Sequence, residues 1–134
     1  MNKIIAVLIG ILFSATLSIA ADDLFSKIDK NKDGKISKKE YLDAVTATFN
    51  KYDLNKNGVL SKEEIKSIEK IESEKFIKDV DSNNDGKIER NEFIAAAEKI
   101  FLGMDKNKDN YIDKKEWNAG KSSTYAPLFI LFTF

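Results

Sequence analysis

Apolar residues recur at fixed offsets around four polar segments of the chain. Each segment has an apolar residue four positions before it, another inside it, and another directly after it. The residues before and after the segments predict helices that enter and leave each segment with one face directed inward, and the residue inside each segment is expected to face the core. The residues before the segments are Phe25, Phe49, Ile77 and Phe101, those inside are Ile36, Leu60, Ile88 and Ile112, and those after are Tyr41, Ile65, Phe93 and Trp117.

The polar segments are each twelve residues long and occupy residues 29–40, 53–64, 81–92 and 105–116. Their starts are 24, 28 and 24 residues apart. Two helices with a connection would need roughly 18 residues, which is more than the first gap and the third gap provide. Residues 41–52, which contain neither Pro nor Gly, are therefore predicted to form one helix that leaves the first segment and enters the second. Such a helix places these two segments at opposite ends. Which segments pair in space, one with four and two with three or otherwise, stays open.

The stretch from residue 65 to residue 80 is longer and rich in charged residues. It suits either one exposed helix or two helices that bend near Ser73. We expect the bend, because it allows two halves, residues 22–70 and residues 74–119, to pack against each other.

The polar segments share a pattern of oxygen-bearing side chains. Each begins with Asp, ends with Glu, and carries Asp or Asn at positions 3 and 5. Calcium is a hard cation that takes six to eight oxygen ligands, and one short loop can supply them from positions 1, 3, 5, 9 and 12 and from the backbone carbonyl of position 7. Position 6 must turn with a positive φ, which Gly tolerates best and Asn next best. Gly34, Gly58 and Gly86 meet this need, whereas Asn110 stands in the fourth segment.

All four segments resemble the EF-hand calcium loop, and the resemblance covers residues 22 to about 119. It implies an all-α fold of EF-hand helix-loop-helix repeats, with two pairs of closely spaced calcium loops that bind up to four Ca²⁺ ions. We number the loops 1 to 4 in chain order. The ligand positions that the resemblance implies are Asp29, Asn31, Asp33, Lys35, Ser37 and Glu40 in loop 1, Asp53, Asn55, Asn57, Val59, Ser61 and Glu64 in loop 2, Asp81, Asn83, Asp85, Lys87, Glu89 and Glu92 in loop 3, and Asp105, Asn107, Asp109, Tyr111, Asp113 and Glu116 in loop 4.

The short spacing departs from the calmodulin pattern, in which separate helices lie between paired loops. The chain looks closer to the compact repeats of bacterial exported calcium-binding proteins. Its short repeat is also similar to that of dockerin modules, although those usually close the loop with Asp rather than Glu.

The four loops differ in the number of carboxylates at their ligand positions. Loop 1 has three, loop 2 has two, and loops 3 and 4 have four each. Calcium affinity rises with ligand charge until the ligands repel one another. We therefore expect loop 2 to be the weakest site.

The composition of the chain argues against several other classes of function. The chain has 22 basic and 22 acidic residues, so its net charge gives no reason to expect nucleic acid as a partner. It contains no Cys and no His, which excludes disulfides, thiolate or imidazole metal sites, and the common nucleophilic triads. We expect no enzymatic activity, because the clustered carboxylates are accounted for as calcium ligands.

The first twenty residues have the pattern of a signal peptide. A short positive start that includes Lys3 precedes an apolar run, and Ser18-Ile19-Ala20 offers small residues for a signal peptidase. We expect cleavage after Ala20 or Ala21 and a periplasmic or secreted protein. The alternative is a retained membrane anchor, because the run approaches the length of a spanning helix.

The end of the chain, residues 120–134, is predicted to be a polar linker followed by an apolar tail. Gly120 and the polar run after it are expected to stop the last helix. The apolar tail is too short to span a bilayer. We expect it to fold back onto a groove of its own protein. A contact with a membrane or a partner and an extension without a role are the alternatives.

The function expected from the sequence is calcium binding outside the cytoplasm, by a buffer or by a module that calcium stabilises. The alternatives are a calcium sensor and a calcium-dependent interaction or adhesion module with an unidentified protein partner. Sensors of the calmodulin kind use Met-rich surfaces. The chain has only two Met residues, one of them Met1, which makes the sensor less favoured.

Overall fold

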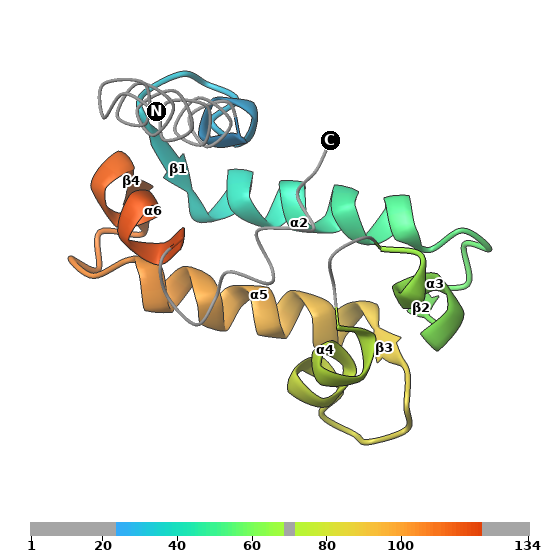
Figure 1. Cartoon of the computed structure of the whole chain (residues 1–134). Helices are drawn as coiled ribbons and strands as arrows, with labels where there is room; N and C mark the ends of the chain where they lie inside the picture. The colour runs from blue at the N-terminus through green and yellow to red at the C-terminus, as the bar shows by residue number, and fades with distance from the viewer. Residues whose placement is uncertain (1–23, 69–71, 122–134) are drawn as a thin grey trace, which may run out of the picture.

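In the computed structural model, residues 24–68 and 72–121 are described, and short helices and strands alternate along them (Figure 1). Residues 24–28 are helical and lead into the first loop. The elements that follow are β1 (Lys35–Ser37), α2 (Lys38–Tyr52), β2 (Val59–Leu60), α3 (Lys62–Lys66), α4 (Ser73–Val80), β3 (Ile88–Glu89), α5 (Arg90–Met104), β4 (Tyr111–Asp113) and α6 (Lys114–Lys121).

Two 15-residue helices, α2 and α5, form the centre of the molecule. The single helix predicted over residues 41–52 is confirmed by α2, and α5 is its counterpart between loops 3 and 4. The side chain of Ser37 caps the start of α2 by accepting the N–H of Glu40. The helix ends where Asp53 opens the next loop and donates its N–H to the carbonyl of Phe49. Each long helix therefore leaves one loop and enters another.

The two long helices run in opposite directions side by side (Figure 1). Near one end of the pair, the rings of Tyr41 and Phe101 have centroids 5.4 Å apart. Near the other end, Phe49 and Phe93 have centroids 5.5 Å apart in an edge-to-face arrangement. The loops consequently gather in two groups, one at each end of this central pair.

Short antiparallel strands join the loops in pairs. β1 pairs with β4, so loop 1 lies beside loop 4, and β2 pairs with β3, so loop 2 lies beside loop 3. The registers place Ile36 opposite Ile112 and Leu60 opposite Ile88. The fold is thus helical with two short ladders and not purely α. The ladders also decide the pairing that the sequence left open.

The core lies between the long helices and the shorter helices around them. Of the twelve apolar residues predicted to face inward, eleven are buried, and Ile77 is only partly buried. In α4 the buried positions are Phe76 and Val80 instead, and the Phe76 ring lies 6.5 Å from the Phe93 ring. The helix that enters loop 3 is therefore rotated slightly relative to the repeat pattern.

The predicted bend in residues 65–80 is confirmed, because α3 and α4 are separate helices. Gly120 itself lies inside α6, which is described as far as Lys121, and the rest of the polar run expected to stop this helix lies outside the described residues. A Cβ atom at Gly120 would lie 2.9 Å from Cγ of Met104, closer than real side chains approach. Glycine at this position therefore serves close packing of α6 against the end of α5.

None of the helices formed by residues 24–68 and 72–121 is both long enough and apolar enough to cross a membrane. The predictions for the signal peptide in residues 1–20 and for the apolar tail after residue 121 lie outside the described residues.

Candidate metal centre: four loops with one hydrogen-bond network

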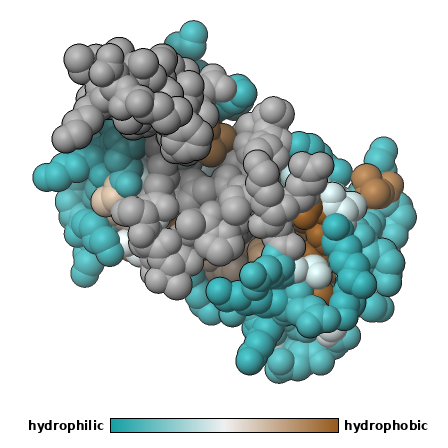
Figure 2. Space-filling view, in the orientation of Figure 1, coloured by the Kyte–Doolittle hydropathy of each residue, from teal (hydrophilic) through white to brown (hydrophobic). Residues whose placement is uncertain are grey.

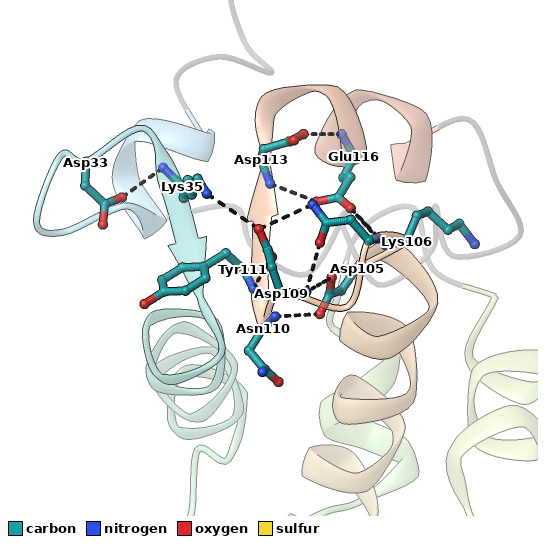
Figure 3. A network of polar contacts seen from close by, with 10 residues as sticks. Asp33, Lys35, Asp105, Lys106, Asp109, Asn110, Tyr111, Asp113 and Glu116 are labelled. Atoms are coloured by element: carbon teal, nitrogen blue, oxygen red, sulfur yellow. Dashed lines mark hydrogen bonds and ion pairs between the residues drawn. The ribbon is translucent and has the colours of Figure 1, made fainter.

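The Asp at position 1 organises the first half of every loop. In loop 4, one carboxylate oxygen of Asp105 accepts the N–H of Asp109 at 3.2 Å and the other accepts the N–H of Asn110 at 3.0 Å (Figure 3). The same two contacts recur at Asp29, Asp53 and Asp81, with distances between 2.8 and 3.3 Å. The Asp at position 1 thus fixes the backbone turn at positions 5 and 6.

The side chains at positions 3 and 5 extend this network. In each loop the Asn at position 3 accepts the N–H of position 5, at 2.9 or 3.0 Å. The Asp or Asn at position 5 then accepts the N–H of position 7, at 2.9 Å in all four loops. The position 7 residues Lys35, Val59, Lys87 and Tyr111 lie in or directly before the strands.

The Glu at position 12 closes each loop. In loop 4, one oxygen of Glu116 accepts the N–H groups of Lys106 and Asn107, and the other accepts the N–H of Asp113 at 3.1 Å (Figure 3). The equivalent bonds form in loops 1, 2 and 3. In loops 1, 2 and 4, position 9 also caps the helix that follows, because its side chain accepts the N–H of position 12, for example Asp113 from Glu116 at 2.8 Å.

The loops bury acidic side chains that would normally face water. Among the described residues, the buried polar or charged side chains are Thr48 and seven carboxylates. All seven stand at position 1 or position 12: Asp29, Asp53, Glu64, Asp81, Glu92, Asp105 and Glu116. Burying carboxylates close together costs free energy unless hydrogen bonds or a cation compensate for their charge. Such a set of oxygens is suited to a hard divalent cation.

The hydrogen bonds favour the ionised form of the closing Glu. At Glu40 and Glu92, burial disfavours the charged carboxylate, but the loop N–H groups and the Ser37 or Ser82 side chains outweigh this effect and lower the pKa. At Glu64, the backbone N–H of Ser61 is the largest cause of a lowered pKa. These carboxylates are therefore held as anions at neutral pH, which is the form that binds a metal ion.

The backbone turns as the loop pattern requires. Gly34, Gly58 and Gly86 have φ between 80° and 83°, and Asn110 has φ of 65° in the same position of loop 4. The expectation that Asn110 adopts this conformation is confirmed.

Sequence reasoning missed a second left-handed residue at position 4. Lys32, Lys56 and Lys108 have φ near 60°, as does Asn84. Only Asn84 belongs to a residue type that favours this region, so the lysines at position 4 of the other three loops did not indicate the turn.

The carboxylates of these loops do not form a complete metal site by themselves. In residues 24–68 and 72–121, no group of three or more Asp, Glu, His or Cys side chains is arranged to hold a metal ion by itself. Position 3 is Asn in every loop, and position 5 is Asn57 in loop 2. A site in these loops therefore needs amide oxygens and the carbonyl of position 7 as well, which is a donor set that fits calcium.

The structure brings the predicted ligand residues together loop by loop. Positions 1, 3, 5, 9 and 12 of each loop are joined by the bonds described above, and position 7 is joined through its backbone. Family models described as the EF hand match residues 21–45 and 98–120, and one described as an EF-hand domain pair matches residues 45–98. These matches together run from residue 21 to residue 120. The chain belongs to the EF-hand family.

The family matches agree with the spatial pairing of the EF hands. The matched domain pair contains loops 2 and 3, which the β2–β3 ladder joins. The two single EF-hand matches contain loops 1 and 4, which the β1–β4 ladder joins although they are far apart in the sequence. EF-hand domains indicate calcium binding. A search among curated proteins found no matching relative.

Proposed function

We propose that all four EF-hand loops bind calcium and that calcium stabilises the folded chain outside the cytoplasm, where it acts as a buffer or a calcium-dependent structural module. The observation that carries this proposal is the common hydrogen-bond network. Loop 2 has only two carboxylates and loop 4 lacks the glycine, yet both form the same bonds as loops 1 and 3.

The residues of each loop have distinct roles in this proposal. The Asp at position 1 and the Glu at position 12 provide the buried carboxylates, and the Glu supplies two oxygens. Positions 3 and 5 provide further side-chain oxygens, and position 7 provides its carbonyl. Calcium supplies positive charge that offsets the repulsion among these groups. The loop N–H groups orient the carboxylates.

The arrangement of the long helices supports a buffer or structural module over a sensor. A sensor opens an apolar groove when calcium changes the angle between the helices of an EF hand. Here α2 and α5 each belong to two EF hands and pack against each other at both ends, so movement at one loop must disturb another.

The exposed surface also favours a buffer or structural module. Among the described residues, the large exposed apolar side chains are only Leu54, Leu102 and Tyr111. The described surface in Figure 2 is mostly hydrophilic.

Calcium titration followed by NMR tests binding at each loop. The backbone amides of Gly34, Gly58, Gly86 and Asn110 each donate to the Asp at position 1, so each reports on its own loop. We expect all four amides to shift with calcium. The variant Glu92→Gln should abolish the high-affinity response of Gly86 and leave that of Gly34 intact. An unchanged Gly86 response would remove Glu92 from the ligands.

An apolar fluorescent dye separates the buffer from the sensor. The proposal predicts that dye binding stays constant or falls when calcium is added. A rise in dye fluorescence with calcium would instead favour a sensor that exposes a groove.

Export is the remaining part of the proposal, and it is supported by the signal-peptide pattern of residues 1–20. Mass spectrometry of protein recovered from the periplasm or medium of a bacterial host should find a chain that begins at Ala21 or Asp22. Recovery of the intact chain in the membrane fraction would support the retained anchor.

A further inference from the structure

The side chain of a lysine in loop 1 contacts a carboxylate at a ligand position of loop 4. The Nζ atom of Lys35 is 3.5 Å from the Oδ2 atom of Asp109, which stands at position 5 of loop 4 (Figure 3). Among the ion pairs of residues 24–68 and 72–121, this one joins one calcium loop to a ligand position of another.

The strand register places Lys35 there. β1 and β4 are antiparallel, with Lys35 opposite Asp113 and Ser37 opposite Tyr111. Lys35 and Tyr111 are therefore diagonal neighbours on the same face of the ladder. The Nζ atom of Lys35 lies 5.4 Å from the centre of the Tyr111 ring, a cation–π contact that holds the ammonium group over loop 4.

The oxygen that Lys35 contacts is the one least committed to the loop backbone. The Oδ1 atom of Asp109 accepts the N–H of Tyr111 at 2.9 Å, which is the bond common to all four loops. The Oδ2 atom accepts only side-chain donors, the Nδ2 group of Asn107 at 3.3 Å and Lys35. The position 5 residue of loop 1, Asp33, has the matching Nδ2 contact from Asn31, at 3.0 Å. At position 5, the contact with the lysine is what distinguishes loop 4 from loop 1.

We propose that Lys35 lowers the calcium affinity of loop 4 by competing with calcium for the carboxylate of Asp109. This inference rests on the proposed function, because it concerns the regulation of one of the four sites. Calcium bound through Asp109 would stand beside the ammonium group, and two cations at one carboxylate repel each other. The side chain of Lys35 therefore acts on loop 4 in the opposite way to a ligand: it stabilises calcium-free loop 4 and weakens the loaded form, whereas the backbone carbonyl of Lys35 belongs to the ligands of loop 1.

The size of this effect is set by the exposure of the pair. The side chains of Lys35 and Asp109 are 49% and 36% exposed, so water and salt screen their interaction. We expect Lys35 to reduce the affinity of loop 4 by about three- to tenfold at low salt. Loops 3 and 4 have equal numbers of carboxylates, and the competition predicts that loop 4 is the weaker of the two.

Calcium titration of the full chain by NMR tests the proposal, with the amide of Asn110 as the reporter for loop 4 and that of Gly86 for loop 3. Lys35→Gln should raise the affinity at Asn110 by about three- to tenfold and leave Gly86 unchanged. Lys35→Arg retains the positive charge and should keep the low affinity. The increase should shrink in about 1 M salt, where the Debye length is only about 3 Å.

Lys75→Gln is the matched control, because Lys75 is exposed on α4 and its loss changes the net charge by the same amount. Equal affinity at Asn110 in Lys35→Gln and the wild type would overturn the proposal. An equal increase in Lys75→Gln, or an equal increase at all four loops, would overturn it as well. If Asn110 does not respond to calcium in the wild type, the proposed function fails for loop 4 and this inference fails with it. If it responds equally in both proteins, only the role of Lys35 is refuted.

Discussion

The variant Phe93→Ala examines whether calcium binding and the central helix pair are energetically linked. Phe93 directly follows the closing Glu of loop 3 and is only 2% exposed. Its ring packs edge-on against Phe49 of α2 and Phe76 of α4, with centroid distances of 5.5 and 6.5 Å. Truncation of Phe93 therefore removes contacts among three helices that flank loops 2 and 3.

The expected cost is large relative to the stability of a domain of this size. Replacing a fully buried Phe with Ala destabilises a protein by about 3–5 kcal/mol. A small domain is typically stable by only about 5–15 kcal/mol, so the calcium-free variant should be close to unfolded. Calcium at 100 times its dissociation constant adds about 2.7 kcal/mol for each site that binds only the folded state. Four such sites would more than compensate for the lost ring.

Urea unfolding followed by circular dichroism measures this effect with chelator and with saturating calcium. In chelator, the unfolding midpoint of Phe93→Ala should fall by on the order of 2–3 M, and calcium should restore a cooperative transition. Leu102→Ala is the control, because Leu102 lies on the same helix but is 61% exposed, and its truncation should cost less than about 0.5 kcal/mol. Equal midpoints for the two variants would refute the packing argument. A Phe93→Ala chain that stays unfolded in calcium would refute the link between binding and folding.

Three further predictions follow from the loops. Asn110→Gly should stabilise the calcium-free protein by about 1 kcal/mol because Gly adopts a positive φ without strain, whereas Gly58→Asn should cost a similar amount; urea midpoints in chelator compare the two. Folding lowers the pKa of Glu40, Glu64 and Glu92, so the stability that they contribute is present above their unfolded pKa, near 4.5, and is lost as the pH falls through the lower folded values. Unfolding midpoints of the calcium-free protein should therefore fall in acid, and a flat profile from pH 6 to pH 3 would contradict these shifts. Loop 2, with two carboxylates, should fill last in the NMR titration, and early filling would show that ligand charge does not order the sites.

Much of the fold could be predicted from the sequence because the loop repeat is strict. The twelve-residue gap between loops 1 and 2 was too short for two helices, and this limit predicted α2 directly. The apolar residue at position 8 was predicted to face the core, and Ile36, Leu60, Ile88 and Ile112 are all buried in the ladders.

The pairing of the loops could not be predicted, because it depends on contacts between residues far apart in the chain. Position 8 is apolar in every loop, so each loop presents a similar strand edge for pairing with any of the other loops. The choice is made by the antiparallel packing of α2 on α5, which brings loop 1 to loop 4. The proximity of Lys35 to Asp109 follows from this pairing and was hidden for the same reason. The close contact of Gly120 with Met104 could not be predicted either, because it is also non-local.

The most direct test of four functional loops is calcium titration calorimetry of the chain. We expect four calcium ions to bind per chain, and Glu116→Gln to reduce this number by one because it removes the closing ligand of loop 4. Binding of fewer than four ions by the wild type would contradict the conclusion that the shared hydrogen-bond network makes every loop a calcium site.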